Sequence, residues 1–398
     1  MMKTYLFNRN IVCNTFVTLY NTHIIDTIRA EINKLIYFST HTSKNASVLQ
    51  GFSAIDTAGK MKYNENENNR KTTSYKGGSN LLSIIIPHYK ETFEFMRPLF
   101  ESLDGQRLID FSQVEVIIVN DCGEPLRMEQ FEKYEHIRPH LISTAENSGV
   151  GVARQTGIDY AHGDFLMFID ADDCLNGPHA LFRIMSAIYE KPETDLFHGQ
   201  FIEEQVIEDK YGLYLHNRDI TFCHGKVYRK AFLTEKNVRC HPTLRYNEDS
   251  YFNALVYAEA ERVEYIDTPL VIWTCNPNST VRLGGLYAYK KLPDYIQSVS
   301  DLCAELVARK KPHAKTTFLQ ALNYIYFQLQ DEAWGLKRVK EYRPAAIEAT
   351  RRFFKRHEAL YECGSTERLN FFNECRKQHG TPIMESQTFN QFMEEICK

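Results

Sequence analysis

Four short apolar runs between residues 81 and 170 constrain the fold more than any other feature of this sequence. Each run is rich in β-branched or aromatic residues, which favour strands, and each is followed by polar residues or ended by a proline. Segments with helical spacing of apolar residues lie between them, at residues 93–103, 128–134 and 150–161. Strands that alternate with helices predict an α/β fold with a mostly parallel sheet and helices on both faces. The four runs are LLSIIIP (81–87), VEVIIVND (114–121), HLIST (140–144) and FLMFID (165–170).

The polar residues after these strands predict where a ligand binds. In open parallel sheets, ligands bind outside the carboxyl ends of the strands, which lie at one edge of the sheet. The sequence places polar groups there at residues 87–91, 120–121, 147–149 and 170–173. Four chain segments should therefore converge on one site, and this convergence is a stronger indication than any single motif.

Three aspartates, Asp170, Asp172 and Asp173, fall within four positions at the end of the fourth run. Carboxylates this close raise one another's pKa unless a positive charge lies nearby. Mg²⁺ and Mn²⁺ prefer carboxylate oxygens and complete their coordination with water and substrate phosphates, so the cluster predicts a site for one of these ions. The alternative is that the aspartates only cap the following helix, near residues 177–189.

A helix start in ENSGVGVARQTG (146–157) predicts an anion site. Free backbone N–H groups near Ser148 and Gly149 favour an anion, and Arg154 follows one turn further in. The glycines match only part of a dinucleotide fingerprint, because no third glycine falls at the required place.

Two further carboxylate features lie elsewhere in the chain. Asp121, at the end of the second strand, is suited to accept hydrogen bonds from a base or ribose. Glu248 and Asp249 begin a predicted helix in NEDSYF (247–252), and a second carboxylate pair is what an acid–base step requires. The alternative is that Asp249 caps this helix and Glu248 is merely exposed.

The rest of the chain divides by composition. Residues 1–62 form an N-terminal extension with one predicted helix at 23–38, and the polar residues 63–80 read as a linker. An α/β unit is expected at 81–285 and a helical region at 286–398. The predicted helices of that region are Leu286–Arg309, Thr316–Lys340 and Ala345–Tyr361.

Composition favours a soluble cytoplasmic protein. No run approaches the roughly 18 apolar residues that cross a bilayer, and the first residues do not resemble a secretion signal. The ten cysteines form no CxxC pair, and the net charge of −4 gives no whole-chain argument for nucleic acid or membrane. Residues 309–356 contain 12 Lys or Arg against 4 Asp or Glu. This excess indicates a solvated helix face or, as an alternative, a polyanion or the inner face of a membrane.

Six stretches, in order, resemble the motifs of family 2 glycosyltransferases with the GT-A (Rossmann-like) fold. They cover about residues 81–282, half of the chain. One such motif would be a weak signal, but six in the same order are a strong one. The stretches are IIIPHYKE (84–91), EVIIVNDCGE (115–124), ENSGVGVARQTGIDYAHGDFLMFIDADD (146–173), HGKVYRKAFL (224–233), NEDSYF (247–252) and PLVIWTCNPNSTVR (269–282).

The resemblance implies a catalytic domain at 81–285 with a nucleotide-sugar donor, UDP-sugar being the first choice. It also implies Mn²⁺ or Mg²⁺, inversion at the sugar carbon, and a glycan, glycolipid or other hydroxyl acceptor. Asp172 would be the principal metal ligand with help from Asp170, and Asp249 would be the catalytic base with Glu248 beside it. The residues implied around the donor are Pro87, Tyr89, Glu91, Asp121, Gly149, Arg154, Asp170 and Lys226.

The sequence departs from the family pattern at several positions. Asn120 and Asp121 stand where the family often has two aspartates, which weakens the expected nucleobase contact. His224 stands where another residue is common, and it is either a further metal ligand or a hydrogen-bonded structural histidine.

Two rival interpretations remain from sequence alone. Phosphatases of the haloacid-dehalogenase type also carry DxD after a strand, but here Asp173 and Cys174 follow in place of Gly-Thr, deep within the domain. The other rival is a non-catalytic module that binds a nucleotide or a polyanion, in which case binding would depend steeply on salt.

Overall fold

A computed structural model describes residues 81–207, 210–276, 290–329, 341–361, 373 and 386–397. The predicted helix at 23–38 and the predicted linker at 63–80 lie outside these described residues.

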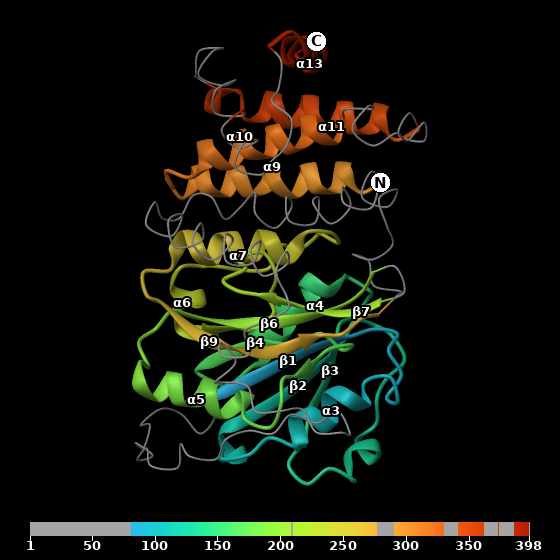
Figure 1. Cartoon of the computed structure of the whole chain (residues 1–398), viewed down its shortest axis with the longest axis vertical. Coiled ribbons are helices and arrows are strands. Elements are labelled where there is room, and N and C mark those ends of the chain that lie inside the picture. The colour runs from blue at the N-terminus through green and yellow to red at the C-terminus, as the bar shows by residue number, and fades with distance from the viewer. Residues whose placement is uncertain are drawn as a thin grey trace, which may run out of the picture. The chain divides into compact units, whose positions relative to one another are not determined.

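A single mixed sheet forms the centre of the α/β part (Figure 1). Its strands follow the order β3-β2-β1-β4-β8-β6-β9-β5, and β7 pairs with β6 outside this path. The first four strands are parallel, as the sequence predicts. The strands are β1 (Leu82–His88), β2 (Val114–Asn120), β3 (His140–Ser143), β4 (Phe165–Phe168), β5 (Cys174–Leu175), β6 (Leu196–Ile207), β7 (Lys210–His216), β8 (Lys226–Arg229) and β9 (Val263–Trp273).

The second half of the sheet is mixed, because β6 pairs parallel with β9 while its other pairings are antiparallel. Strand β8 pairs antiparallel with β4 and β6, and β6 pairs antiparallel with β7. Only residues 208 and 209 join β6 to β7, and so short a connection permits only antiparallel pairing. The predicted α/β fold with flanking helices is confirmed, and its sheet is mixed.

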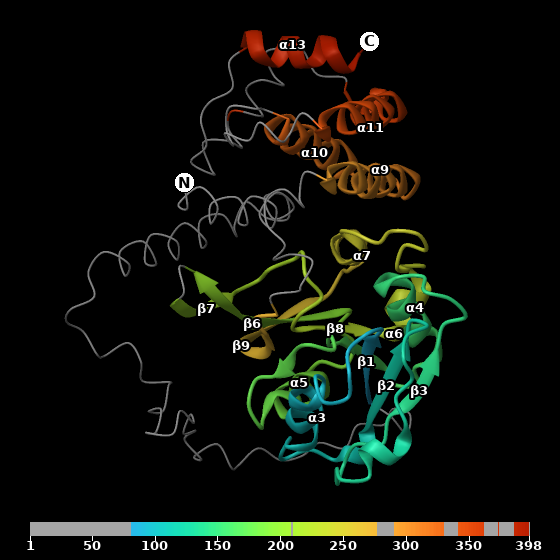
Figure 2. The same cartoon turned by 90° about the vertical axis from the view of Figure 1, so that its right-hand side faces the viewer.

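Helices cover both faces of the sheet. Helices α4 and α7 lie on one side, and α3 and α5 lie on the other (Figures 1 and 2). Every residue of β1 is buried, as expected for a strand covered on both faces. The predicted helix at 93–103 begins only at Arg97, with Pro98 in its first turn, and the one predicted at 128–134 is a short 3₁₀ turn, η3. The elements are α3 (Arg97–Asp104), η3 (Met128–Phe131), α4 (Val150–Tyr160), α5 (Ala180–Glu190), α6 (Lys230–Glu235) and α7 (Glu248–Glu259).

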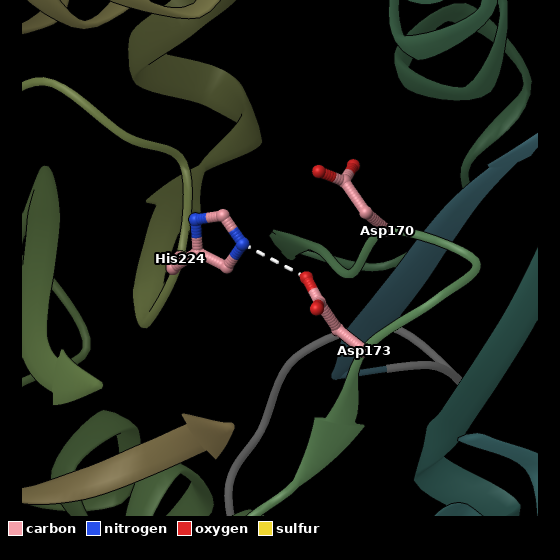
Figure 3. Close-up of side chains that lie close together, drawn as sticks. All are labelled: Asp170, Asp173 and His224. Carbon is pink, nitrogen blue, oxygen red and sulfur yellow. Dashed lines mark hydrogen bonds and ion pairs between the residues drawn. The ribbon is translucent and has the colours of Figure 1, made fainter. Parts of the chain in front are cut away.

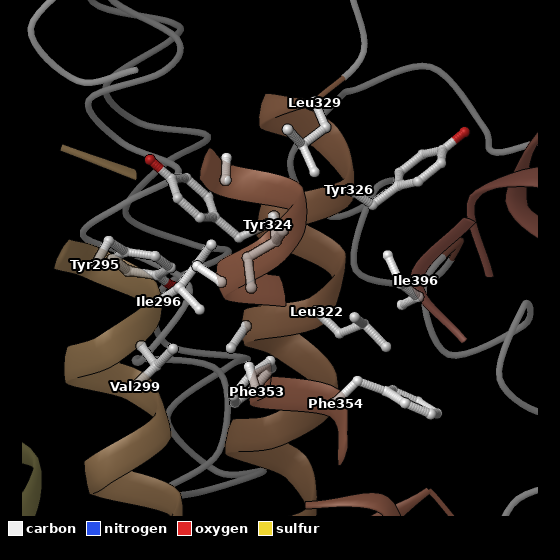
Figure 4. Packing of buried hydrophobic residues seen from close by; sticks show 14 of the residues in the cluster. Tyr295, Ile296, Val299, Leu322, Tyr324, Tyr326, Leu329, Phe353, Phe354 and Ile396 are labelled. Atoms are coloured by element: carbon white, nitrogen blue, oxygen red, sulfur yellow. The ribbon is translucent and has the colours of Figure 1, made fainter. Parts of the chain in front are cut away.

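The predicted helical C-terminal region is also present. Its helices share a core of aromatic and aliphatic side chains, including Tyr295, Leu322 and Phe353 (Figure 4). No helix in the described part of the chain is long and apolar enough to cross a bilayer. The helices are α9 (Leu292–Ala308), α10 (Ala314–Gln328), α11 (Arg343–Arg356) and α13 (Ser386–Ile396).

Helix α4 packs closely on the parallel strands because it presents Gly157 to them. A Cβ atom on Gly157 would lie 2.3 Å from Cγ2 of Ile85 and 3.3 Å from Cγ2 of Val119. Both neighbours are fully buried β-branched side chains, so neither can easily move away. The glycine therefore sets the distance between α4 and the sheet, and with it the position of every side chain on α4.

We expect Gly157→Ala to lower the free energy of unfolding by up to about 2 kcal/mol. Overpacking costs about 1–3 kcal/mol, and the better helix propensity of alanine returns about 1 kcal/mol. Urea denaturation of the full chain measures the difference. Asp159→Ala is the control, because Asp159 is an exposed residue of the same helix whose ion pair with Arg239 is exposed as well. An equal effect of the two substitutions would show that α4 does not depend on this contact.

Candidate active site

The carboxyl ends of the four parallel strands meet at one edge of the sheet, as predicted. His88, near the end of β1, pairs with Asn120 of β2, which pairs in turn with Ser143 of β3. On the other side of β1, Ile85 pairs with Phe168, the last residue of β4. The polar segments that follow these strands therefore lie together.

The loop after β1 folds tightly against the turn after β2. Glu91 Oε2 accepts hydrogen bonds from the backbone N–H groups of Tyr89 (2.9 Å) and Lys90 (3.1 Å). A Cβ on Gly123 would lie 1.5 Å from the carbonyl oxygen of Tyr89, so only glycine fits there. Tyr89 and Glu91 are half-buried at the site, whereas Pro87 is buried within β1.

The asparagine at position 120, where the family often has an aspartate, has a structural explanation. The Asn120 side chain closes the turn after β2: its Oδ1 accepts from Gly123 N at 2.7 Å, and its Nδ2 donates to Gly123 O at 3.0 Å. An aspartate at position 120 has no amide with which to donate the second bond.

Asp121 occupies the anion site that the sequence predicts at the start of α4. Its carboxylate accepts from the backbone N–H groups of Ser148 (2.9 Å) and Gly149 (2.7 Å), and from the Thr144 hydroxyl (3.0 Å). Gly149 adopts φ = 96°, which favours glycine. The chain's own carboxylate thus binds the amides that were expected to be free, and Asp121 fastens β2 to α4.

Arg154 joins two carboxylates that are far apart in the sequence. Its Nη2 donates to Asp170 Oδ1 at 2.7 Å, and its Nη1 donates to Glu248 Oε1 at 3.1 Å. The residue is only 4% exposed, and its guanidinium lies 5.8 Å from the Phe168 ring centroid. Burial alone would lower the pKa of Arg154, but Asp170 and the other acidic neighbours raise it well above its ordinary value. Arg154 therefore stays charged and brings α7 to the end of β4.

Asp170, Asp173 and His224 form a cluster of three groups that can hold a metal ion. One ligand atom from each lies within 4.8 Å of the others. His224 Nε2 is 2.8 Å from Asp173 Oδ2 (Figure 3). The other ring nitrogen of His224 is buried without a partner among the described residues. Two carboxylates and an imidazole fit a divalent cation such as Mn²⁺.

Asp172, expected to be the principal ligand, lies outside this trio. Its Oδ2 accepts from Asn276 Nδ2 at 2.8 Å, while Asp173 Oδ1 accepts from Thr274 N at 2.9 Å. The structure thus makes Asp173, a member of the predicted acidic cluster that was not singled out as a ligand, part of the trio, and it brings in Thr274 and Asn276, to which the sequence alone gave no role in the site. A sequence signal did exist, because polar residues follow β9 just as they follow the parallel strands.

The electrostatics of the cluster favour a bound cation. Burial, reinforced by Asp170 and Asp172, raises the pKa of Asp173 to about 6 although His224 opposes this. Burial likewise raises the pKa of Asp172, with Asp170 adding to it. Burial would raise the pKa of Asp170 as well, but Arg154 and His224 hold it below its ordinary value. A bound cation that replaces the proton also stabilises carboxyl groups whose pKa is raised in this way.

Glu248 and Asp249 stand in the first turn of α7 and face the same site. Burial, with Asp249, raises the pKa of Glu248 to about 7 although Arg154 opposes it. Burial also raises the pKa of Asp249. The negative charge of Asp170 raises this pKa further, and His224 lowers it. The Asp249 carboxylate accepts hydrogen bonds only from Ser250 within the described part of the chain. The two carboxylate groups of the sequence therefore lie in one site.

Lys226 differs from its predicted placement near the donor or acceptor. It is 0% exposed, and its ammonium donates to the carbonyl oxygens of Asp219 (2.6 Å) and Phe222. A buried ammonium must find such partners within the protein. Lys226 thus holds the loop 217–225, which carries His224 into the cluster, and does not itself face the site.

Comparison with known proteins supports the family and the fold. Residues 83–254 match the family model described as Glycosyl transferase family 2. This segment is a family 2 glycosyltransferase domain. Because these residues match a glycosyltransferase family, the interpretation of the chain as a haloacid-dehalogenase-type phosphatase loses its support.

Among curated relatives, the chain is 30% identical over 227 residues to the uncharacterized glycosyltransferase EpsJ of Bacillus subtilis (strain 168), covering 51% of this chain and 63% of EpsJ. It is 25% identical over 198 residues to the poly(ribitol-phosphate) beta-N-acetylglucosaminyltransferase TarS of Staphylococcus aureus (strain Mu50 / ATCC 700699), covering 46% of this chain and 34% of TarS. The chain thus spans less than two thirds of either relative.

Solved structures show the same fold. The crystal structure of S. aureus TarS 1-349 superposes with a TM-score of 0.57 at 20% identity, covering 79% of this chain and 90% of that chain. The same fragment in complex with UDP-GlcNAc gives a TM-score of 0.58. The predicted GT-A fold is therefore confirmed.

We expect Arg154→Met to lower the free energy of unfolding by at most about 3–5 kcal/mol, because it leaves the half-buried Asp170 and Glu248 without their cation. The loss should shrink as the pH falls. Because Arg154 lowers the pKa of Asp170, the stability that the pair contributes is fully present above the ordinary pKa of an aspartate and is lost as the pH falls through the lowered pKa of Asp170.

Urea denaturation in the presence of a chelator measures this difference at several pH values. Arg245→Met is the matched control, because Arg245 is exposed and bonds only to Asn147 within the described residues. Similar losses for both variants, or a loss at Arg154 that does not vary with pH, would contradict the electrostatic role of Arg154.

Proposed function

We propose that the protein is a metal-dependent inverting glycosyltransferase that moves a sugar from a nucleotide-sugar donor, first of all a UDP-sugar, to an acceptor hydroxyl. The observation that carries the proposal is the Asp170–Arg154–Glu248 bridge, which unites the candidate metal cluster and the α7 carboxylates in one site of a family 2 domain. The likeness to TarS, which is solved with UDP and with UDP-GlcNAc, supports the choice of donor.

The donor would bind beside the ends of β1 and β4. Tyr89 and Glu91 are the half-buried side chains of the β1 loop that are suited to the nucleoside. Asp170, Asp173 and His224, with Asp172 beside them, are the groups suited to hold Mn²⁺ or Mg²⁺. Such an ion, when bound, supplies positive charge that stabilises the departing nucleoside diphosphate.

Asp249 is the better candidate for the catalytic base. A base must be free to take a proton from the acceptor hydroxyl, and a carboxylate with a raised pKa takes it more readily. The pKa of Asp249 is raised mainly by burial, and its carboxylate accepts only from the neighbouring Ser250 among the described residues. Glu248, in contrast, is held by Arg154, so its role is to position that arginine and the start of α7.

The acceptor would be a glycan, a glycolipid or another hydroxyl compound. The basic stretch 309–356 gives limited support for a polyanion or a membrane surface, because most of its described charges have partners. Contact with the inner face of a membrane, and a cytoplasmic location, remain predictions. The basic residues with acidic partners are Arg309, Lys311, Arg343, Arg351, Arg352 and Arg356.

The proposal is tested with a panel of nucleotide sugars in the presence of Mn²⁺. We expect at least one UDP-sugar to stabilise the protein against heat and to be consumed when an acceptor is present. Asp249→Asn should bind that donor as the wild type does and should lower the transfer rate by about 10²–10⁴.

Asp267→Asn is the matched control, since Asp267 lies on β9 away from the strand ends, and it should leave transfer unchanged. Equal loss of donor binding and of transfer in Asp249→Asn would remove Asp249 as the base. Failure of every nucleotide sugar to bind would overturn the proposed function.

A second test concerns the metal ligands. We expect Asp173→Asn to raise the Mn²⁺ concentration needed for half-maximal stabilisation about tenfold or more, because it removes a charged oxygen from the cluster. Asp159→Asn, an exposed aspartate on α4 paired with Arg239, is the control. A large effect of Asp172→Asn and none of Asp173→Asn would restore the assignment made from sequence. No effect of either would mean that the ion binds elsewhere.

A further inference from the structure

The β6–β7 hairpin exposes more large apolar side chains than any other part of the described chain. Five of the eleven exposed large hydrophobic residues lie on it. Apolar surface gathered in one place marks an interaction site, whereas single exposed apolar residues do not. The five are Val206, Tyr211, Leu213, Tyr214 and Leu215.

Strand β7 is an edge that lacks the usual protection against pairing with another chain. Among the described residues it pairs with β6 alone, and Figure 2 shows it at the margin of the sheet. Proteins protect such edges with prolines, bulges, several charges or very short strands. The seven residues KYGLYLH contain no proline and one lysine, and their register with β6 has no bulge. The backbone groups of this edge are therefore suited to another strand.

One face of the hairpin carries an apolar stripe. Side chains alternate along a strand, so Tyr211, Leu213 and Leu215 share a face. Val206 pairs directly with Tyr211 and extends the stripe onto β6. Tyr211 and Leu213 are 62% and 57% exposed, so the stripe is open to a partner.

We propose that β7 pairs antiparallel with β7 of a second copy of this chain, around a two-fold axis at Leu213. In this register Leu213 faces itself, and each Tyr211 faces Leu215 of the other copy. Directly opposed apolar pairs of this kind stabilise antiparallel sheets. On the other face Tyr214 lies opposite Gly212, where a Cβ would meet no described atom within 4 Å, so there is room for the ring. The strand is self-complementary, which a two-fold contact requires.

The charges of the hairpin favour a second copy over a lipid surface. Glu204 of β6 lies opposite Leu213 on the face of the stripe, and an anionic membrane would repel its carboxylate. Strand β7 carries two side chains that can be charged, Lys210 and His216, and in the two-fold register both lie at the ends of the contact. The charge of His216 is balanced by Glu203, whose Oε2 lies 3.0 Å from His216 Nε2. A stable interface buries about 800 Å² per partner, so a seven-residue edge should give a weak dimer that depends on concentration.

Sedimentation velocity of the full chain, over a roughly hundredfold range of concentration, tests the proposal. We expect the wild type to shift from monomer to dimer. Leu213→Lys and Leu213→Glu should each weaken the dimer about tenfold or more, because like charges would face each other on the axis. An equal mixture of the two variants should recover the dimer, because the lysine of one copy would then face the glutamate of the other. Val307→Lys and Val307→Glu, which change an exposed aliphatic residue of α9, should leave the dimer unchanged.

A wild type that stays monomeric at every concentration overturns the proposal, and so do Leu213 variants that dimerise normally or a mixture that does not recover. Circular dichroism and urea denaturation check that the variants fold. A monomer that sediments with anionic vesicles would assign the hairpin to a lipid surface. A monomer whose β7 amides resist hydrogen exchange would show that the same chain covers the edge. Sugar transfer by a monomeric wild type would defeat this inference and leave the proposed function intact.

Discussion

The buried guanidinium of Arg154 is the interaction on which the site depends. It balances the negative charges of Asp170, at the end of β4, and of Glu248, at the start of α7. Removing charges from water is costly, and the cost is recovered only where the geometry is good and further hydrogen bonds are made. Here Asp249, Asp172 and Asp173 add further negative charge that one arginine cannot balance. The remaining imbalance is what makes a divalent cation a fitting ligand for the cluster.

The position of that guanidinium follows from packing. Arg154 lies one turn before Gly157 on α4, and the close approach of Gly157 to Ile85 fixes the helix against β1 and β2. Asp121 then fastens the start of the same helix to the end of β2 through two backbone N–H groups. The arginine is thus presented by a helix held at two points, and this leaves little freedom in the direction of its side chain.

The sequence predicts the first half of this arrangement well because its signals are local. Buried parallel strands read as apolar runs, and the polar residues after them must meet at one edge. The second half depends on long-range pairing. Nothing near residue 226 indicates that its ammonium turns toward the carbonyls of Asp219 and Phe222, and nothing near Asp121 indicates that it binds the amides of the α4 start. The presence of Asp173 in the cluster in place of Asp172 reflects His224, which approaches from a loop 51 residues away in the sequence.

That loop also connects the site to the hairpin. Residues 217–225 run from the end of β7 to the start of β8, and Lys226, together with the bonds from the Thr221 and Phe222 amides to Asp219, holds them in place. On the face of the hairpin that carries the apolar stripe, the Tyr211 hydroxyl donates to Glu204 Oε1, and Glu204 Oε2 accepts from the backbone N–H of Cys275.

The residue after Cys275 is Asn276, whose side chain binds Asp172. The edge strand and the acidic cluster therefore share two independent connections, one through His224 and one through Glu204.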